Sequence, residues 1–228
     1  MERFGSKFHL SQIKSLLLQL LTAINYLHKN SFIHRDIKLS NILINKNGVL
    51  KLTDFGLARK ISMLNHNNAT AYTPKLVTLW YRAPEVLLQI GKYSWHCDVW
   101  AIGCVFAEVL NGGKPLFPGK NELNQFELIC ELIGKPSKVI WNDFFKEGND
   151  NNNNNTCEKL LERVSGCKYN KIGVVFGEYG NECVDLVSSF LTWDPKRRIS
   201  VTEAMLHDFF KVYPYPSKIN KDFLEKYI

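Results

Sequence analysis

The stretch HRDIKLSN at residues 34–41, followed by DFG at residues 54–56, decides how this chain is interpreted. Together the two motifs supply two aspartate carboxylates, the ammonium group of Lys38 and the side-chain amide of Asn41. Phosphoryl transfer uses these groups: a carboxylate orients the attacking hydroxyl, a cation balances charge on the moving phosphoryl group, and oxygen ligands hold Mg²⁺. We therefore expect the four side chains to share one site.

Two short apolar runs between the motifs predict a β-hairpin. They cover residues 42–44 and 49–52, and the NKNG sequence at 45–48 between them is typical of a tight turn. A hairpin brings its two outer ends together. Asn41, just before the first strand, and Asp54, just after the second, should therefore lie close to each other.

Helical periodicity dominates the rest of the chain. Apolar residues between 13 and 27 recur at helical spacing, which predicts a helix with Ser11 as its N-cap and an end near His28. Residues 98–110 are apolar on nearly every side, as in a buried central helix, and Asn-Gly-Gly at 111–113 should stop it. Further helices are expected over residues 123–133, over about 183–191, and after a capping box at 200–203. The expected fold class is α+β, mainly α.

Composition restricts the class of protein. The net charge is +7, but Lys and Arg are scattered, so a solvated surface is favoured over nucleic-acid binding. Six cysteines without a C-x-x-C pair indicate reduced thiols rather than a zinc site or a disulfide framework. No secretory block or membrane-spanning segment is evident. We expect a protein of the nucleus, the cytoplasm or both, without membrane association.

A third motif, VTLWYRAPE at residues 77–85, completes a resemblance to eukaryotic protein kinases and, among them, to cyclin-dependent kinases. YTP at 72–74 and PLFPG at 115–119 are similar to the PITSLRE-type branch. The resemblance covers about residues 5–211 and only the C-terminal lobe of a kinase, a helical bundle with a short hairpin near the catalytic loop. No G-x-G-x-x-G loop and no V-A-I-K-like lysine precede that loop in this sequence.

The resemblance also implies a division of the chain. Residues 1–211 would form the catalytic domain without its N-terminal lobe, and residues 212–228 a C-terminal tail. The asparagine-rich tract at about 147–157 cannot bury apolar surface and is expected to be a disordered insertion. We expect the polypeptide to be a partial product, or the product of a truncated gene model, of an otherwise active kinase.

The same resemblance implies a role for each site residue. Asp36 would accept or orient the proton of the substrate hydroxyl, and Lys38 would neutralise charge on the transferred phosphoryl group. Asn41 and Asp54 would hold Mg²⁺ together with ATP. Thr78 would complete the catalytic set by bridging toward Asp36 and Lys38. The expected nucleotide-contacting residues are Lys38, Asn41, Leu43 and Asp54.

Other charged residues resemble regulatory and structural positions of the family. Thr73 matches the activating phosphosite, whose phosphate would pair with Arg35 and a neighbouring arginine such as Arg59. By the same resemblance, Asp98 would steady the catalytic loop. Arg198 would pair with Glu85.

Two functions remain open from the sequence. The first is an ATP- and Mg²⁺-dependent serine/threonine kinase that favours proline after the phosphorylated residue, with protein substrates and a cyclin-like regulatory subunit. The second is a non-catalytic kinase lobe that binds substrates or regulators as a scaffold or decoy. The intact catalytic residues favour the first, and the missing upper lobe favours the second for this polypeptide alone. A nucleic-acid-binding function has only the net charge to support it.

Overall fold

The structure is a computed structural model that describes residues 8–61, 78–88, 94–137, 139–140 and 169–219. The predictions on Thr73 and on the asparagine-rich tract therefore lie outside the described residues.

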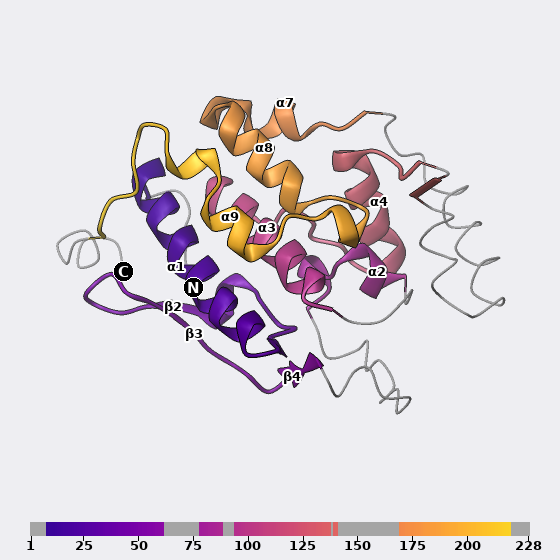
Figure 1. Ribbon diagram of the computed structural model, residues 1–228. Coiled ribbons are helices and arrows are strands. Elements are labelled where there is room, and N and C mark those ends of the chain that lie inside the picture. Colours follow the sequence, from indigo (N-terminus) through magenta and orange to yellow (C-terminus); the bar gives the residue numbers. More distant parts are fainter. Residues whose placement is uncertain (1–7, 62–77, 89–93, 138, 141–168, 220–228) are drawn as a thin grey trace.

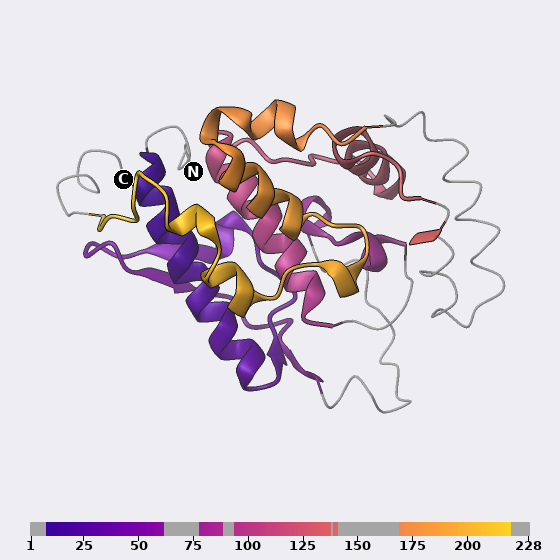
Figure 2. The same ribbon diagram turned by 45° about the horizontal axis from the view of Figure 1, so that its top comes forward.

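The core is built around helix α3 (His96–Leu110), which lies between α1 (Leu10–Lys29) and α8 (Asn181–Phe190) (Figures 1 and 2). Nearly every residue of α3 is buried, including Val99, Trp100 and Ile102. The prediction of a central buried helix is confirmed, although α3 begins two residues earlier than expected. After Asn111, Gly112 and Gly113 have φ of 67° and 82°, conformations that glycine adopts without steric cost, and the helix stops there.

Helix α1 packs one apolar face on this core and begins earlier than predicted. The expected N-cap, Ser11, is wrong, because His9 is the N-cap residue and its N–H donates to Oε1 of Gln12 at 2.9 Å. Ser11 instead lies inside the first turn, where its hydroxyl accepts a hydrogen bond from that of Ser217 at 3.0 Å. The helix ends at Lys29, one residue beyond the predicted end.

The predicted hairpin is confirmed. Strands β2 (Ile42–Ile44) and β3 (Leu50–Leu52) pair antiparallel, with Ile42 opposite Leu52. In the turn, Oδ1 of Asn45 accepts the N–H groups of residues 47 and 49, both at 3.0 Å. A second two-stranded sheet, β1 (Phe32–Ile33) with β4 (Arg59–Lys60), was not predicted, because each strand has only two residues.

Short helices connect these elements. The capping box at Ser200 and Glu203 is confirmed, but the helix that it starts is short, because a second, 3₁₀ segment with His207 as its cap follows at once. The remaining described elements are η2 (Leu39–Asn41), η5 (Leu79–Tyr81), α2 (Pro84–Leu87), α4 (Glu122–Ile133), α7 (Ile172–Phe176), η6 (Gly177–Tyr179), η7 (Pro195–Arg197), α9 (Val201–Met205) and η8 (Asp208–Phe210).

After η8 the chain returns along α1. Nζ of the buried Lys14 donates to the carbonyl of Val212 at 2.8 Å, and the N–H of Ser217 donates to the carbonyl of Ser11 at 3.0 Å. We call residues 211–219 the C-terminal strap (yellow in Figures 1 and 2). Within the described ranges, no helix has the length and apolar character needed to cross a membrane.

Candidate active site

The backbone of the HRD segment donates hydrogen bonds to one buried carboxylate at the start of α3. Oδ2 of Asp98 accepts the backbone N–H of His34, and Oδ1 accepts that of Arg35, both at 2.9 Å. Nε2 of His28, at the end of α1, lies 2.9 Å from the same Oδ2. Arg35 has a φ of 70°, which is unfavourable for a residue with a side chain. The bonds to Asp98 offset this cost and hold the loop in shape.

This loop brings three of the predicted site residues together. Nζ of Lys38 lies 2.7 Å from Oδ2 of Asp36, and Nδ2 of Asn41 donates to the same oxygen at 3.0 Å. A further bond runs from Nδ2 of Asn41 to the backbone carbonyl of Asp36 at 2.9 Å. Asp36 is only 4% exposed. The two donors, Lys38 and Asn41, hold its carboxylate in one orientation.

The second motif joins this cluster through the open end of the hairpin. Both the N–H and the hydroxyl of Thr53 donate to the carbonyl of Asn41, at 2.9 and 3.0 Å. The next residue is Asp54, which is exposed and has a φ of 61°. The prediction that the hairpin brings Asn41 and Asp54 together is confirmed at the level of the backbone.

His34 links the two motifs, a role that the sequence analysis did not assign to it. Its Nδ1 lies 3.3 Å from the N–H of Asp36, and its Nε2 lies 3.2 Å from the carbonyl of Thr53. A ring that accepts at Nδ1 and donates at Nε2 satisfies both contacts. Phe55 packs edge-on against the same ring, with 4.9 Å between ring centroids.

Strand β2 presents the apolar side chain of Leu43 on the face opposite the core. Along β2 the exposed Leu43 alternates with Ile42 and Ile44, which are both half-buried. Leu43 is 51% exposed and Phe55 is 49% exposed, so an apolar surface adjoins the polar cluster. This is the face on which Leu43 was expected to contact a nucleotide.

The structure does not contain the predicted bridge from Thr78, whose catalytic role stays a prediction. Within the described part of the chain, no hydrogen bond joins Thr78 to Asp36 or Lys38. Lys38 instead lies against Asp36 itself, and Thr78 is the residue before η5, where its carbonyl accepts the N–H of Tyr81 at 3.4 Å.

Of the two arginines predicted around the phosphosite, one belongs to the HRD motif and the other follows the DFG motif. Arg35 is half-buried in the HRD segment, and Arg59 is exposed on β4, where its Nη1 donates to the carbonyl of Ala58 at 2.8 Å. Their expected partner, Thr73, lies outside the described residues.

The segment after Thr78 is fixed to α3 and to the segment that precedes α4 by contacts that the sequence analysis missed. The hydroxyl of Tyr81 donates to Oε2 of Glu108 at 2.6 Å inside the core, and Nε1 of Trp80 donates to the carbonyl of Gly119 at 3.1 Å. Burial raises the pKa of both the Tyr81 phenol and the Glu108 carboxyl. The hydrophobic pattern of the sequence could not predict the pairing of Tyr81 with Glu108, because each residue belongs to a different apolar segment of the chain.

The predicted pair of Arg198 and Glu85 is formed. Nη1 and Nη2 of Arg198 lie 2.8 and 3.1 Å from the two carboxylate oxygens of Glu85. The guanidinium also donates to the carbonyls of Thr192 and His96. This pair ties the end of the VTLWYRAPE motif to the core.

With this geometry established, the comparison with known proteins is decisive. Residues 2–210 match the protein kinase domain family. The chain belongs to this family. The prediction of a eukaryotic protein kinase with cyclin-dependent relatives is confirmed.

Individual relatives are cyclin-dependent kinases. The chain is 41% identical over 218 residues to the "Probable cyclin-dependent kinase 10" of Dictyostelium discoideum, covering 96% of this chain and 56% of the relative. It is 40% identical to cyclin-dependent kinase 11B of Rattus norvegicus, covering 95% of this chain and 47% of the relative. This kinase-family chain thus spans about half the length of these relatives.

A solved structure gives the same result for the fold. The yeast RNA Pol II CTD kinase CTDK-1 complex contains a chain that superimposes with a TM-score of 0.80 at 35% sequence identity. The match covers 96% of this chain and 70% of that chain. The helix-rich kinase fold expected from the motifs is therefore confirmed.

Proposed function

We propose that this chain is the C-terminal lobe of a serine/threonine protein kinase of the cyclin-dependent type, which transfers the γ-phosphate of ATP to protein substrates. The observation that carries the proposal is the cluster of Asp36, Lys38 and Asn41 at the open end of a hairpin that ends in Asp54. The few short strands of the described residues and the absence of a G-x-G-x-x-G loop in the sequence support the assignment to one lobe.

In this proposal the buried carboxylate of Asp36 orients the substrate hydroxyl and takes its proton. Two donors hold that carboxylate, so little reorganisation is needed when the hydroxyl arrives. Lys38 lies 2.7 Å away and is half-buried, which suits it to balance charge on the phosphoryl group as it moves. The family preference for proline after the phosphorylated residue is carried over as part of the proposal.

The residues present fit Mg²⁺ and ATP. Because Nδ2 of Asn41 faces Asp36, its Oδ1 is the atom left to serve as an oxygen ligand. Asp54 is exposed, and its Oδ1 accepts a bond from the N–H of Gly56 at 3.3 Å, the one hydrogen bond to its carboxylate from the described residues. Bound Mg²⁺ would neutralise charge on the ATP phosphates, and Leu43 would offer an apolar contact to the base.

Phosphate transfer from radiolabelled ATP tests this function. The purified 228-residue chain is incubated with Mg²⁺, ATP and a protein substrate rich in Ser-Pro and Thr-Pro, beside Asp36→Asn and Asp54→Ala variants. Asp185→Asn is the control, because Asp185 is an exposed residue of α8 that bonds His207. We expect the first two variants to lose about 10²-fold or more of the activity and the control to keep it. Equal incorporation by the wild type and Asp54→Ala would exclude catalysis by this polypeptide.

A non-catalytic scaffold or decoy is the second candidate. The exposed Leu43, Phe55 and Val49 on the hairpin side favour it, since an uncovered apolar surface promotes association. Equilibrium binding of substrate proteins that is unchanged by Asp36→Asn, together with no phosphate incorporation, is the result expected for this candidate. The mass of the protein in a cell extract would show whether a longer form carries the remaining lobe.

A cyclin-like regulatory subunit is the proposed partner. The support is the family of the relatives, which are named as cyclin-dependent kinases, and the solved relative, which is a kinase complex. Co-purification of a cyclin with the full-length product is the direct test.

A further inference from the structure

We propose that Gln19 of α1 is a positioning residue for the active site. It holds the closed end of the β2–β3 hairpin and thereby sets the position of Asn41 and Asp54 at the open end. The consequence for nucleotide binding rests on the proposed function, whereas the mechanical link between the two ends does not.

Gln19 contacts the hairpin through both atoms of its amide. Oε1 accepts the backbone N–H of Leu50 at 2.9 Å, and Nε2 donates to the backbone carbonyl of Gly48 at 3.2 Å. The side chain therefore satisfies an acceptor in the turn and a donor at the first residue of β3. The backbone of a neighbouring strand would make the same two bonds, so the Gln19 amide takes the place of a neighbouring strand at this edge of the hairpin.

The C-terminal strap closes the turn from another direction. Ile219 is buried, and its carbonyl lies so close to Gly48 that a Cβ atom added to the glycine would clash with that oxygen. Gly48 also has a φ of 74°, so no larger residue fits this position without strain. The bonds of Lys14 and Ser11 to the strap keep Ile219 in place.

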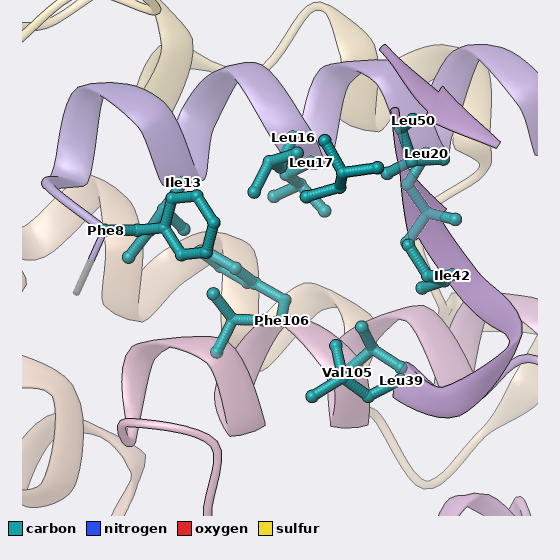
Figure 3. Close-up of a pocket in the computed structure, with 12 residues that line it drawn as sticks. Phe8, Ile13, Leu16, Leu17, Leu20, Leu39, Ile42, Leu50, Val105 and Phe106 are labelled. Atoms are coloured by element: carbon teal, nitrogen blue, oxygen red, sulfur yellow. The ribbon is translucent and has the colours of Figure 1, made fainter. Parts of the chain in front are cut away.

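Packing beneath the hairpin is incomplete, which makes this attachment important. A hollow of about 40 Å³ lies between α1, α3 and the hairpin, and every residue that lines it is apolar (Figure 3). Ile42 and Leu50 border it from the hairpin, and Leu17 and Val105 face it from the two helices. Side chains next to a void lose the dispersion contacts that would otherwise fix them. Ile42, Ile44 and Leu50 still pack on the core, but next to the hollow the hydrogen bonds at the turn add a constraint on the position of the strands.

A displacement at the turn would be transmitted to the site because the hairpin is short. Only three residue pairs separate the turn from its open end, where Thr53 donates twice to the carbonyl of Asn41. The carbonyl of Thr53 lies 3.2 Å from Nε2 of His34, and Nδ1 of the same ring contacts the N–H of Asp36. Loosening the closed end would weaken this set of bonds.

Site-resolved amide hydrogen exchange on the full chain tests the link without any nucleotide. Gln19→Met keeps the length of the side chain and removes both hydrogen bonds, and Gln19→Ala removes the side chain as well. We expect exchange at Leu50 to accelerate at least about tenfold in both variants, because the acceptor of this N–H and the neighbouring bond to Gly48 are both lost. Exchange at Thr53, at the far end, should accelerate about threefold or more. Ile219→Ala, which loosens the turn from the strap side, should produce the same two changes.

Controls separate this effect from a general loss of stability. Thr22→Ala changes an exposed residue of the same helix whose hydroxyl donates to the Leu18 carbonyl, and it should leave both amides unchanged. Amides in the middle of α3, such as that of Ile102, should keep their protection in the Gln19 variants. Faster exchange at Leu50 without a change at Thr53 would overturn the proposal, and so would equal acceleration in α3. Neither result depends on whether the chain is a kinase, so a failed phosphate-transfer assay is a separate outcome.

Discussion

Asp98 holds the left-handed backbone of Arg35 in place. The carboxylate accepts the N–H of Arg35 at 2.9 Å, and Arg35 has a φ of 70°. The same carboxylate accepts the N–H of His34 and lies 2.9 Å from His28, so it serves three groups although it is only 1% exposed. A buried acid at the start of α3 thus shapes the loop that carries Asp36.

Replacing this carboxylate should be severe. Asp98→Ala leaves two buried backbone N–H groups without an acceptor, and each such group costs about 1–3 kcal/mol. We expect the free energy of unfolding to fall by about 3–5 kcal/mol, measured by urea denaturation followed by circular dichroism. The exposed Asp185, which pairs with His207, is the matched control, and Asp185→Ala should cost less than about 0.5 kcal/mol. Similar losses in the two variants would contradict this role of Asp98.

The Arg198–Glu85 pair makes a second prediction about stability. The guanidinium is fully buried and Glu85 is nearly so, so Arg198→Met leaves an uncompensated buried carboxylate. We expect a loss of about 3–5 kcal/mol in the free energy of unfolding. Lys211→Met breaks an exposed pair with Asp208 and should leave the free energy of unfolding nearly unchanged. Arg198→Met combined with Glu85→Gln should recover part of the loss, and a double variant worse than the sum of the two would count against the interpretation.

The hollow beneath the hairpin can be tested by filling it. Val109 lines the hollow and is half-buried on α3, so Val109→Ile adds one methylene where space exists. We expect the free energy of unfolding to rise by about 0.5–1 kcal/mol. Val174→Ile, at a residue that is 85% exposed on α7, should leave it unchanged. A loss of stability in Val109→Ile would show that the hollow is too small for the added group.

Much of the site could be predicted from the sequence because its parts are local. Asp36, Lys38 and Asn41 lie within six residues, so a single loop suffices to bring them together. Asp54 joins them because an apolar run, a turn and a second run fix a hairpin, and a hairpin has only one way to place its ends. The buried positions of α3 followed from a sequence that is apolar on all sides.

Contacts between distant segments could not be predicted in the same way. Gln19 and Leu50 are 31 residues apart in the sequence. In the sequence, the half-buried Gln19 cannot be distinguished from a polar residue on the solvent-exposed face of the helix. The N-cap was misplaced because Ser11 has the stronger intrinsic preference, whereas the geometry of Gln12 favours His9. The Thr78 contact was expected from the resemblance to kinases. Whether it forms depends on the conformation of the backbone before η5 and not on the residue type alone.

His96, the first residue of α3, should make stability depend on pH. Its ring is half-buried, stacks on Trp95 with 3.6 Å between centroids and lies 2.6 Å from the hydroxyl of Ser94. Burial, reinforced by the positive charge of Arg198, lowers the pKa of His96 to about 4 from its usual value near 6.5. Between these two values the unfolded chain binds a proton that the folded chain does not, so acid favours unfolding.

The free energy of unfolding should therefore fall as the pH drops from 7 toward 4. Because the ring is only half-buried, solvent screening reduces the effect, and we expect His96 to contribute about 1–2 kcal/mol over this range. Urea denaturation of the wild type and of His96→Gln at pH 7 and pH 5 measures it, since glutamine can still bond Ser94 but cannot gain a charge. The two proteins should differ in the slope of stability against pH, with the variant less sensitive. Equal slopes would mean that His96 is protonated as readily in the folded chain as in the unfolded one.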